Sequence, residues 1–231
     1  MARANGLHHL AISTGNMKAQ IEFFSDVLGM ELVALYWMHG VEGTWHGFMR
    51  LNDTASVAFV QNEKIAATKP AIGVSHAGSP ALASAPGTMQ HVAFNVDSDE
   101  ELLNMRDRIR SRGINVFGPL DHGMCKSIYF AGLENLSLEI ATSAAAIDAR
   151  AWIDPEVVKL AGIAPDDLAR FKRPAAYKGE GGKLAQPPYD ASKPHQLYPS
   201  QQYKHMLAMS DEQFAKVASV PEPPVRVAAA E

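Results

Sequence analysis

His9-Leu-Ala-Ile-Ser-Thr14 and His91-Val-Ala-Phe-Asn-Val96 are the two stretches of the chain that decide its fold. When they are aligned, residues of similar type occupy equivalent positions. Each begins with a histidine and alternates like a strand with one buried face. Each leads into a run with helical spacing, opened by a capping residue and closed by Gly29 in the first case and Gly113 in the second. The sequence therefore predicts a repeated unit that starts with a strand and a helix.

Further strand-like runs follow the helix in both halves, and they complete a βαβββ pattern. They cover residues 30–36, 44–51 and 56–61 in the first half, and 114–117, 127–130 and 136–141 in the second. Two such modules, at about 7–61 and 88–142, are each too small to bury a sheet alone. We expect an α+β domain over residues 1–143 in which the modules, joined by a linker at 62–87, form one curved mixed sheet around a shared concavity.

Residues 144–231 form a C-terminal extension with a different pattern. Helix starts are predicted at Asp154, Ala164 and Ser210, and the stretches between and after them are rich in proline, glycine, lysine and tyrosine. We expect a partly irregular, helical and Pro-rich arm that lies over the domain or over a second copy, and hence a homo-oligomer.

Charge and composition exclude several classes of partner. The formal net charge is −4 and the basic residues are scattered, so neither nucleic acid nor an anionic membrane is an expected partner. No secretory signal or membrane-spanning run is visible, and the only cysteine, Cys125, fits a reducing compartment. We therefore expect a cytoplasmic protein.

A metal site is predicted by three side chains that should face the concavity. The repeat superposes His9 on His91, so both imidazoles occupy equivalent positions, whereas His8 points to the other face. Glu139 alternates with apolar residues in the last strand, where a carboxylate needs a cation or a base beside it. Two imidazoles and one carboxylate leave coordination positions open, which suits Fe(II) and also accepts Mn, Zn, Ni or Co.

These residues resemble the vicinal oxygen chelate superfamily, which includes glyoxalase I, epimerases, fosfomycin and bleomycin resistance proteins, and type I extradiol dioxygenases. The resemblance covers residues 7–142 and implies that His9, His91 and Glu139 are the metal ligands. The glyoxalases and epimerases add a fourth ligand on the last strand of the first module. Only Gln61, at the end of that strand, could serve here.

A second pattern is similar to that of the extradiol dioxygenases: His122, then Tyr129, then the ligand Glu139. The turn before Glu139 differs, since Leu133 and Asn135 replace the usual proline and glycine; asparagine tolerates the left-handed backbone such a turn needs. The resemblance also implies an acid-base role for His76, which precedes the second ligand by fifteen residues.

The function expected from this resemblance is that of a metal-dependent extradiol dioxygenase, with Fe(II) as the expected metal and a catechol-type aromatic and O2 as substrates. The resemblance implies that His76, His122 and Tyr129 of this chain are the catalytic residues. It predicts no other contacts to the substrate. Two alternatives stay open. One is a glyoxalase-like or epimerase-like lyase or isomerase, and the other is a small-molecule-binding resistance protein.

Overall fold

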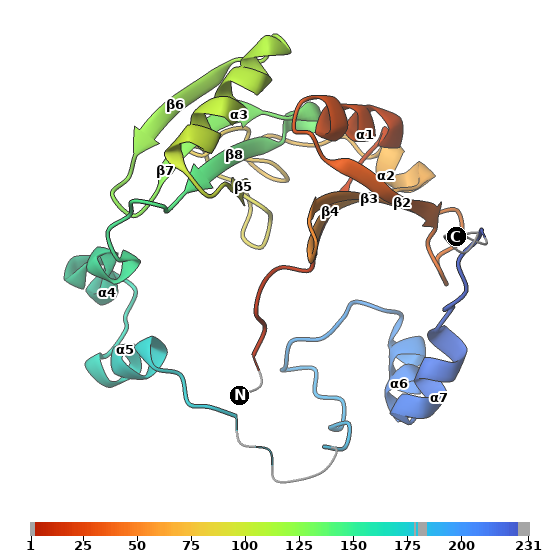
Figure 1. Ribbon diagram of the computed structural model, residues 1–231. Coiled ribbons are helices and arrows are strands. Elements are labelled where there is room, and N and C mark those ends of the chain that lie inside the picture. The colour runs from red at the N-terminus through yellow and green to blue at the C-terminus, as the bar shows by residue number, and fades with distance from the viewer. Residues whose placement is uncertain (1–2, 178, 180–183, 226–231) are drawn as a thin grey trace, which may run out of the picture.

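The computed structural model describes residues 3–177, 179 and 184–225, and it confirms the predicted α+β class. Each half of the domain forms a four-stranded mixed sheet (Figure 1). The first sheet has the order β1-β4-β3-β2, with the strands β1 (His9–Ser13), β2 (Glu31–Trp37), β3 (Trp45–Asn52) and β4 (Ala55–Gln61). The second repeats it as β5-β8-β7-β6, with the strands β5 (Val92–Asn95), β6 (Val116–Asp121), β7 (Lys126–Ala131) and β8 (Ser137–Thr142).

The helices that follow the first strand of each half begin at the predicted capping residues. The Asn16 side chain accepts a hydrogen bond from the backbone N–H of Ala19 at the start of α1 (Met17–Asp26). Ser98 does the same for Glu101 at the start of α3 (Asp99–Ser111). These bonds satisfy N–H groups that have no partner within the helix.

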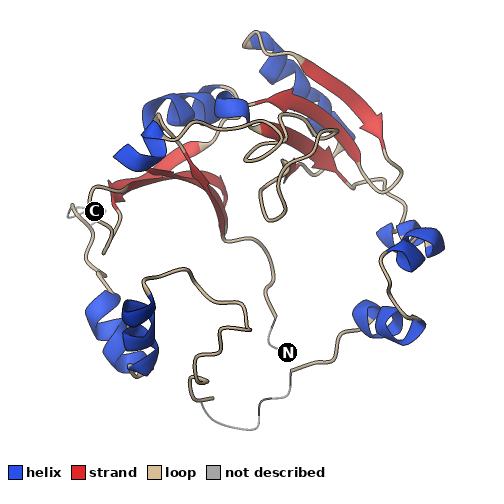
Figure 2. Ribbon diagram, turned by 180° about the vertical axis from the view of Figure 1, so that it is seen from behind, coloured by secondary structure: helices blue, strands red, loops and turns tan. Residues whose placement is uncertain are grey.

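A single core joins the two halves through their helical side (Figure 2). Phe24 of α1 and Phe94 of β5 are both buried, and their ring centroids lie 6.4 Å apart. The Arg108 guanidinium on α3 donates to the carbonyls of Asp26 and Val27 at the end of α1, at 3.1 and 2.8 Å. These contacts fix the two sheets relative to each other.

A second bridge between the halves comes from the turn before β8. The Glu134 carboxylate accepts hydrogen bonds from the backbone N–H of Gly15 at 2.7 Å and from the Gln20 amide at 2.9 Å. Glu134 and Asn135 both have positive φ, 53° and 63°, so the left-handed backbone predicted for this turn is confirmed. The turn therefore aims a charged side chain at the other half.

The sheet faces opposite the helices are where the predicted ligands lie. In β1 the side chains alternate, with Ile12 buried in the core and His9 exposed on the other side. In β5 Phe94 is buried and Ala93 is exposed, and His91 directly precedes this strand. We call these two surfaces the inner faces of the first and the second sheet.

In the described part of the linker and the C-terminal extension there are five further α-helices, α2 (Glu63–Ala67), α4 (Pro155–Leu160), α5 (Pro165–Lys172), α6 (Ser200–Ala208) and α7 (Asp211–Ala218), and a short 3-10 helix at Ala149–Trp152. The predicted start of α7 at Ser210 is confirmed, whereas α2 and α6 were not predicted. The helices α4 to α7 lie outside the two sheets, and these four helices contain no buried residue (Figure 1). Within the described part of the chain, no helix has both the length and the apolar character that crossing a bilayer requires.

Candidate functional site

His91 and Glu139 lie side by side on the inner face of the second sheet. His91 Nε2 is 3.0 Å from Glu139 Oε2. The Glu139 side chain is 7% exposed and that of His91 34% exposed, so the carboxylate is buried and the imidazole forms its border with solvent. A buried carboxylate needs a positive charge or a hydrogen-bond donor beside it, and the His91 imidazole lies in that position. The structure therefore brings two of the three predicted ligands together.

Gln90 determines which nitrogen of His91 is free. The Gln90 amide N–H groups donate to three linker carbonyls, those of Ser79, Pro80 and Leu82, at 3.2, 2.8 and 3.3 Å. This fixes the orientation of the amide, so its oxygen faces His91 Nδ1 and accepts a hydrogen bond from it. In the neutral imidazole the proton is then on Nδ1, and the Nε2 lone pair points at the carboxylate.

Two electron-pair donors that face each other in this way fit a shared cation. Imidazoles that bind metals in proteins are held by a hydrogen bond on their other nitrogen, as His91 is held by Gln90. His91 and Glu139 thus have ligand types and an arrangement that suit the divalent metal predicted from the sequence. Gln90 was not predicted, because its role depends on the carbonyls of the folded linker.

Tyr129 and His122 continue this polar row along the second sheet. Tyr129 is the direct neighbour of Glu139 across β7 and β8. Its hydroxyl oxygen lies 3.1 Å from His122 Nε2. Burial raises the pKa of the Tyr129 phenol, and Glu139 acts in the same direction while Ser127 opposes it. The phenol therefore stays protonated at neutral pH and can donate a hydrogen bond.

His9 lies in a different environment, on the inner face of the first sheet. Its ring centroid is 5.5 Å from that of Phe48 and 6.5 Å from that of His46. In the part of the chain that the structure describes, no three His, Cys, Asp or Glu side chains lie close enough to hold a metal. Within one chain, then, His9 is not brought to His91 and Glu139.

The equivalent positions of the two sheets explain what the first sheet lacks. Two residues after His91, Ala93 pairs with Glu139; two residues after His9, Ala11 pairs with Ala58. Ala58 therefore occupies the place of the carboxylate in the first half and offers no donor. Gln61 is no substitute, because its amide oxygen accepts the backbone N–H of Met17 at 2.6 Å.

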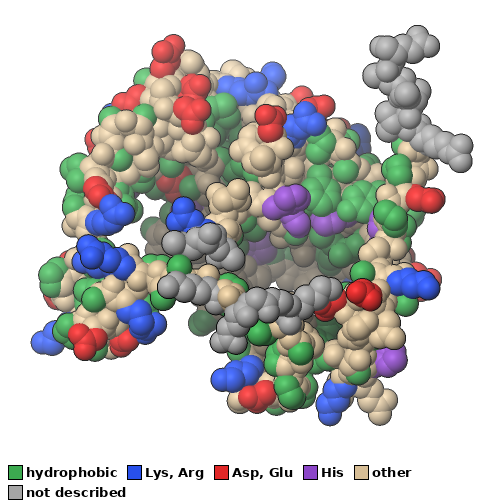
Figure 3. All heavy atoms as spheres, turned by 60° about the horizontal axis from the view of Figure 1, so that its bottom comes forward, with side chains coloured by type: hydrophobic (Ala, Val, Ile, Leu, Met, Phe, Trp, Pro, Cys, Tyr) green, Lys and Arg blue, Asp and Glu red, His purple; other side chains and the backbone are tan. Residues whose placement is uncertain are grey.

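His46 of β3 lies beside His9, and no clear pattern in the sequence pointed to it. It is 8% exposed, and its Nε2 has no hydrogen-bond partner among the described residues. The rings of Phe48 and Tyr36 lie 4.5 and 6.0 Å from its own. Burial lowers the pKa of the His46 imidazole, and His9 lowers it further, so the ring is neutral at pH 7. Histidine side chains gather beside the hollow between the sheets and the extension (Figure 3).

His76 lies in the linker, in a cleft of about 410 Å³. Its Nδ1 is 2.8 Å from the Ser75 hydroxyl, and the cleft is also lined by Lys64, Lys69 and Glu134. The other five predicted site residues do not line this cleft. Its proximity to the metal site thus remains a prediction.

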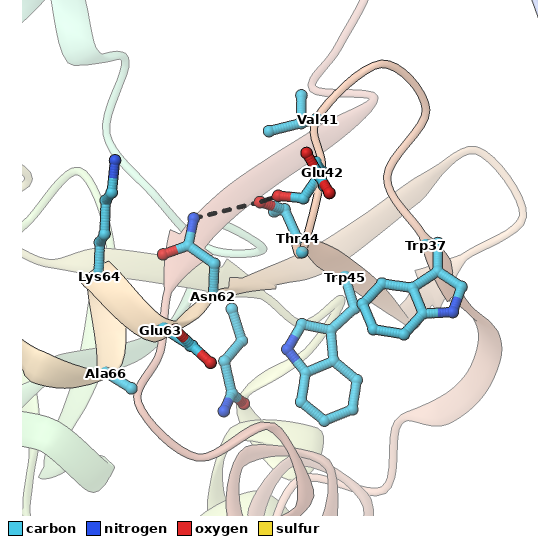
Figure 4. Close-up of a pocket in the computed structure, with 11 residues that line it drawn as sticks. Trp37, Val41, Glu42, Thr44, Trp45, Asn62, Glu63, Lys64 and Ala66 are labelled. Carbon is cyan, nitrogen blue, oxygen red and sulfur yellow. Dashed lines mark hydrogen bonds between the residues drawn. The ribbon is translucent and has the colours of Figure 1, made fainter.

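A larger pocket, of about 580 Å³, lies between the β2–β3 hairpin and α2 (Figure 4). Trp37 and Trp45 stack on each other at its wall, with ring centroids 6.0 Å apart. Asn62 donates to the Thr44 hydroxyl at 3.2 Å across its other side. None of the predicted site residues lines this pocket, so its size does not identify it as the reaction site.

Comparisons with known proteins match the domain that holds this site. A family model described as the Glyoxalase/Bleomycin resistance protein/Dioxygenase superfamily matches residues 6–140, and the match ends before the C-terminal extension. No curated protein matches the chain.

Three solved structures that are similar to this chain illustrate the range of functions among its structural neighbours. A glyoxylase/bleomycin resistance protein/dioxygenase domain from Frankia sp. EAN1pec has 13% identity and a TM-score of 0.49, over 61% of this chain and 99% of that one. The fosfomycin resistance protein FosX from Listeria monocytogenes, in complex with Mn(II) and 1S,2S-dihydroxypropylphosphonic acid, has 16% identity and a TM-score of 0.44, over 64% and 99%. TnmS3, an antibiotic-binding protein from Streptomyces sp. CB03234, has 12% identity and a TM-score of 0.44, over 62% and 99%.

Proposed function

Because the chain belongs to the Glyoxalase/Bleomycin resistance protein/Dioxygenase superfamily, we propose that it is a metal-dependent extradiol dioxygenase that cleaves a catechol-type aromatic. One observation carries the proposal: His91, Glu139, Tyr129 and His122 form a continuous row on one sheet face. The first two are metal ligands by type, and the second two are hydrogen-bonding groups beside them. This combination suits a substrate with two adjacent oxygens.

The metal would be held by His91 and Glu139 together with His9 of a second copy of the chain. Both β1 and β5 are edge strands of their sheets, and edge strands can pair with another chain. A bound Fe(II) would supply open coordination positions for two substrate oxygens and for O2, and would conduct electrons between them. The same homodimer would bring Phe48 and His46 to the metal, since they share a sheet face with His9.

The remaining residues would handle protons and orient the substrate. Tyr129 and His122 would hydrogen-bond the substrate oxygens, and His76 would take a substrate proton and later return one. In the overall reaction the ring C–C bond next to the two hydroxyls breaks. Both atoms of O2 enter the product, one in a carboxylic acid and one in an aldehyde or ketone, so O2 is the oxidant. The new carboxylic acid then releases one proton to water at neutral pH.

The lyase or epimerase alternative has less support from the site. It usually requires a fourth protein ligand, and the candidate positions are Ala58, which has no donor, and Gln61, whose oxygen caps α1. A metal ion with three protein ligands has more open coordination positions for small molecules than one with four. The third possibility, a binding protein without a metal, predicts no bound metal after purification.

Loading the protein with Fe(II) under anaerobic conditions and adding catechols with O2 tests the proposal. The expected result is oxygen uptake matched by a yellow ring-cleavage product with at least one catechol, and neither with Zn-loaded protein. Proton exchange next to a carbonyl, without oxygen uptake for any catechol in the panel, would overturn the dioxygenase proposal in favour of a lyase or epimerase.

A further inference from the structure

The turn between β6 and β7 carries His122, and the start of the C-terminal extension holds this turn by its backbone. Three consecutive carbonyls of the turn accept hydrogen bonds from residues after β8. The Ser143 hydroxyl donates to Met124 O at 3.1 Å, and the Ile147 backbone N–H donates to Gly123 O at 2.8 Å. The Trp152 indole Nε1–H donates to His122 O at 3.0 Å.

The Trp152 ring also packs directly on the turn. Gly123 has φ +77°, and a Cβ added there would collide with the six-membered part of the indole. Glycine is therefore required twice at this position, for its backbone conformation and for the close approach of the ring. The indole is 46% exposed, so it covers the turn from the solvent side.

The two ends of His122 are thus fixed by different partners. Its backbone carbonyl is bound by Trp152, while its ring Nε2 lies 3.1 Å from the Tyr129 hydroxyl. A group that must hydrogen-bond a substrate has to be placed within about 0.5 Å, and a surface turn alone does not hold a side chain so closely. The extension supplies the missing restraint.

We infer that Trp152 is a positioning residue that fixes the His122 imidazole beside Tyr129, so that the extension contributes to the reaction site although it lies outside the family domain. The inference rests on the proposed function for its catalytic part. Its structural part, the placement of the imidazole, does not depend on which reaction occurs.

Trp152→Phe in the full-length protein tests the inference, because it keeps an aromatic ring and removes the N–H donor. We expect kcat to fall by about 10-fold or more, the scale of a displaced catalytic group, while KM and metal content stay unchanged. Trp37→Phe is the matched control, since Trp37 is an exposed tryptophan of the first sheet. It should leave kcat unchanged.

A second measurement is independent of activity: the NMR signal of the His122 Cε1–H group, assigned by its absence in His122→Asn. It should shift or broaden in Trp152→Phe and stay in place in Trp37→Phe. An unchanged His122 signal overturns the inference, and so does an unchanged kcat when the parent protein is active. If the parent cleaves no catechol, the proposed function has failed, and the NMR signal alone decides whether Trp152 fixes the imidazole.

Discussion

The inner faces of the two sheets have the same backbone frame and opposite chemistry. Strand order, helix starts and pairing register repeat from one half to the other. At equivalent positions, however, the first sheet has Ala58 and Phe48 where the second has Glu139 and Tyr129. The first face is aromatic and offers one ligand imidazole, whereas the second carries the carboxylate and the hydrogen-bonding groups.

This difference indicates that the two halves of the domain, which share one backbone arrangement, have different roles in the proposed site. The second sheet would bind the metal and handle substrate oxygens, and the first would complete the coordination and contact the substrate ring. Among the described residues of one chain, His9 does not form a metal-holding group with His91 and Glu139, so the proposed function requires that different chains contribute the two faces.

Mixing two inactive variants gives the largest expected effect. His9→Ala and Glu139→Ala should each lose metal by more than about 100-fold in affinity, since first-sphere ligands matter more than their supports. After the two variants are unfolded and refolded together, mixed dimers contain one intact site, so about a quarter of the sites should recover metal and activity. Elemental analysis and oxygen uptake measure the recovery.

His205→Ala, on the exposed helix α6 of the extension, is the control for this experiment and should keep its metal. No recovery in the mixture, with both variants folded and dimeric, would show that the site forms within one chain. The inner faces of the first and the second sheet would then contribute to one site within a single chain.

Tyr129→Phe tests the chemistry that only the second face carries. Removing the hydroxyl should lower kcat by about 10²-fold, the usual loss for one donor that stabilises developing charge, and leave metal content unchanged. Tyr177→Phe, an exposed tyrosine of the extension, is the matched control. If Tyr129→Phe keeps full turnover, the polar row has no catalytic role beyond metal binding.

His46→Phe tests the aromatic face of the first sheet. The change keeps a ring and removes the unpaired Nε2, so catechol binding to the Zn-loaded protein should weaken by about 10-fold, the equivalent of one lost hydrogen bond. Calorimetry measures the dissociation constant, and His205→Phe on α6 is the control. Unchanged affinity would mean that the substrate does not meet His46.

The capping residues test whether the shared frame is also energetically equivalent. Asn16→Ala and Ser98→Ala should each lower the free energy of unfolding by about 1 kcal/mol, because each frees one N–H at a helix start. Urea denaturation measures the change, and Asn104→Ala on the exposed side of α3 should not lower stability. Clearly unequal losses of stability at the two caps would show that the two halves share their backbone geometry but not the energetic weight of their helix starts.

The sequence was sufficient for the features that depend on local signals. Asn16 and Ser98 cap their helices as predicted, and the alternation around Glu139 correctly indicates its proximity to His91. Asn135 has the left-handed backbone expected of it. Each of these features is determined by a few neighbouring residues or by the register of one strand pair.

Features that depend on distant segments could not be predicted. Gln90 sets the His91 tautomer only because the linker folds back to offer carbonyls, and Trp152 reaches His122 from thirty residues away. The packing of α1 against the second half through Arg108 likewise joins residues that are 81 positions apart. No local pattern in the sequence specifies such contacts.

The Arg108 bridge has a consequence for how the chain folds. The last carbonyls of α1 lack partners within their own helix, and the second half supplies them with a guanidinium. An isolated first half would leave these groups to water and would expose Phe24, so it should be a poor folding unit. We therefore expect the two halves to unfold in a single cooperative transition, as one thermodynamic domain.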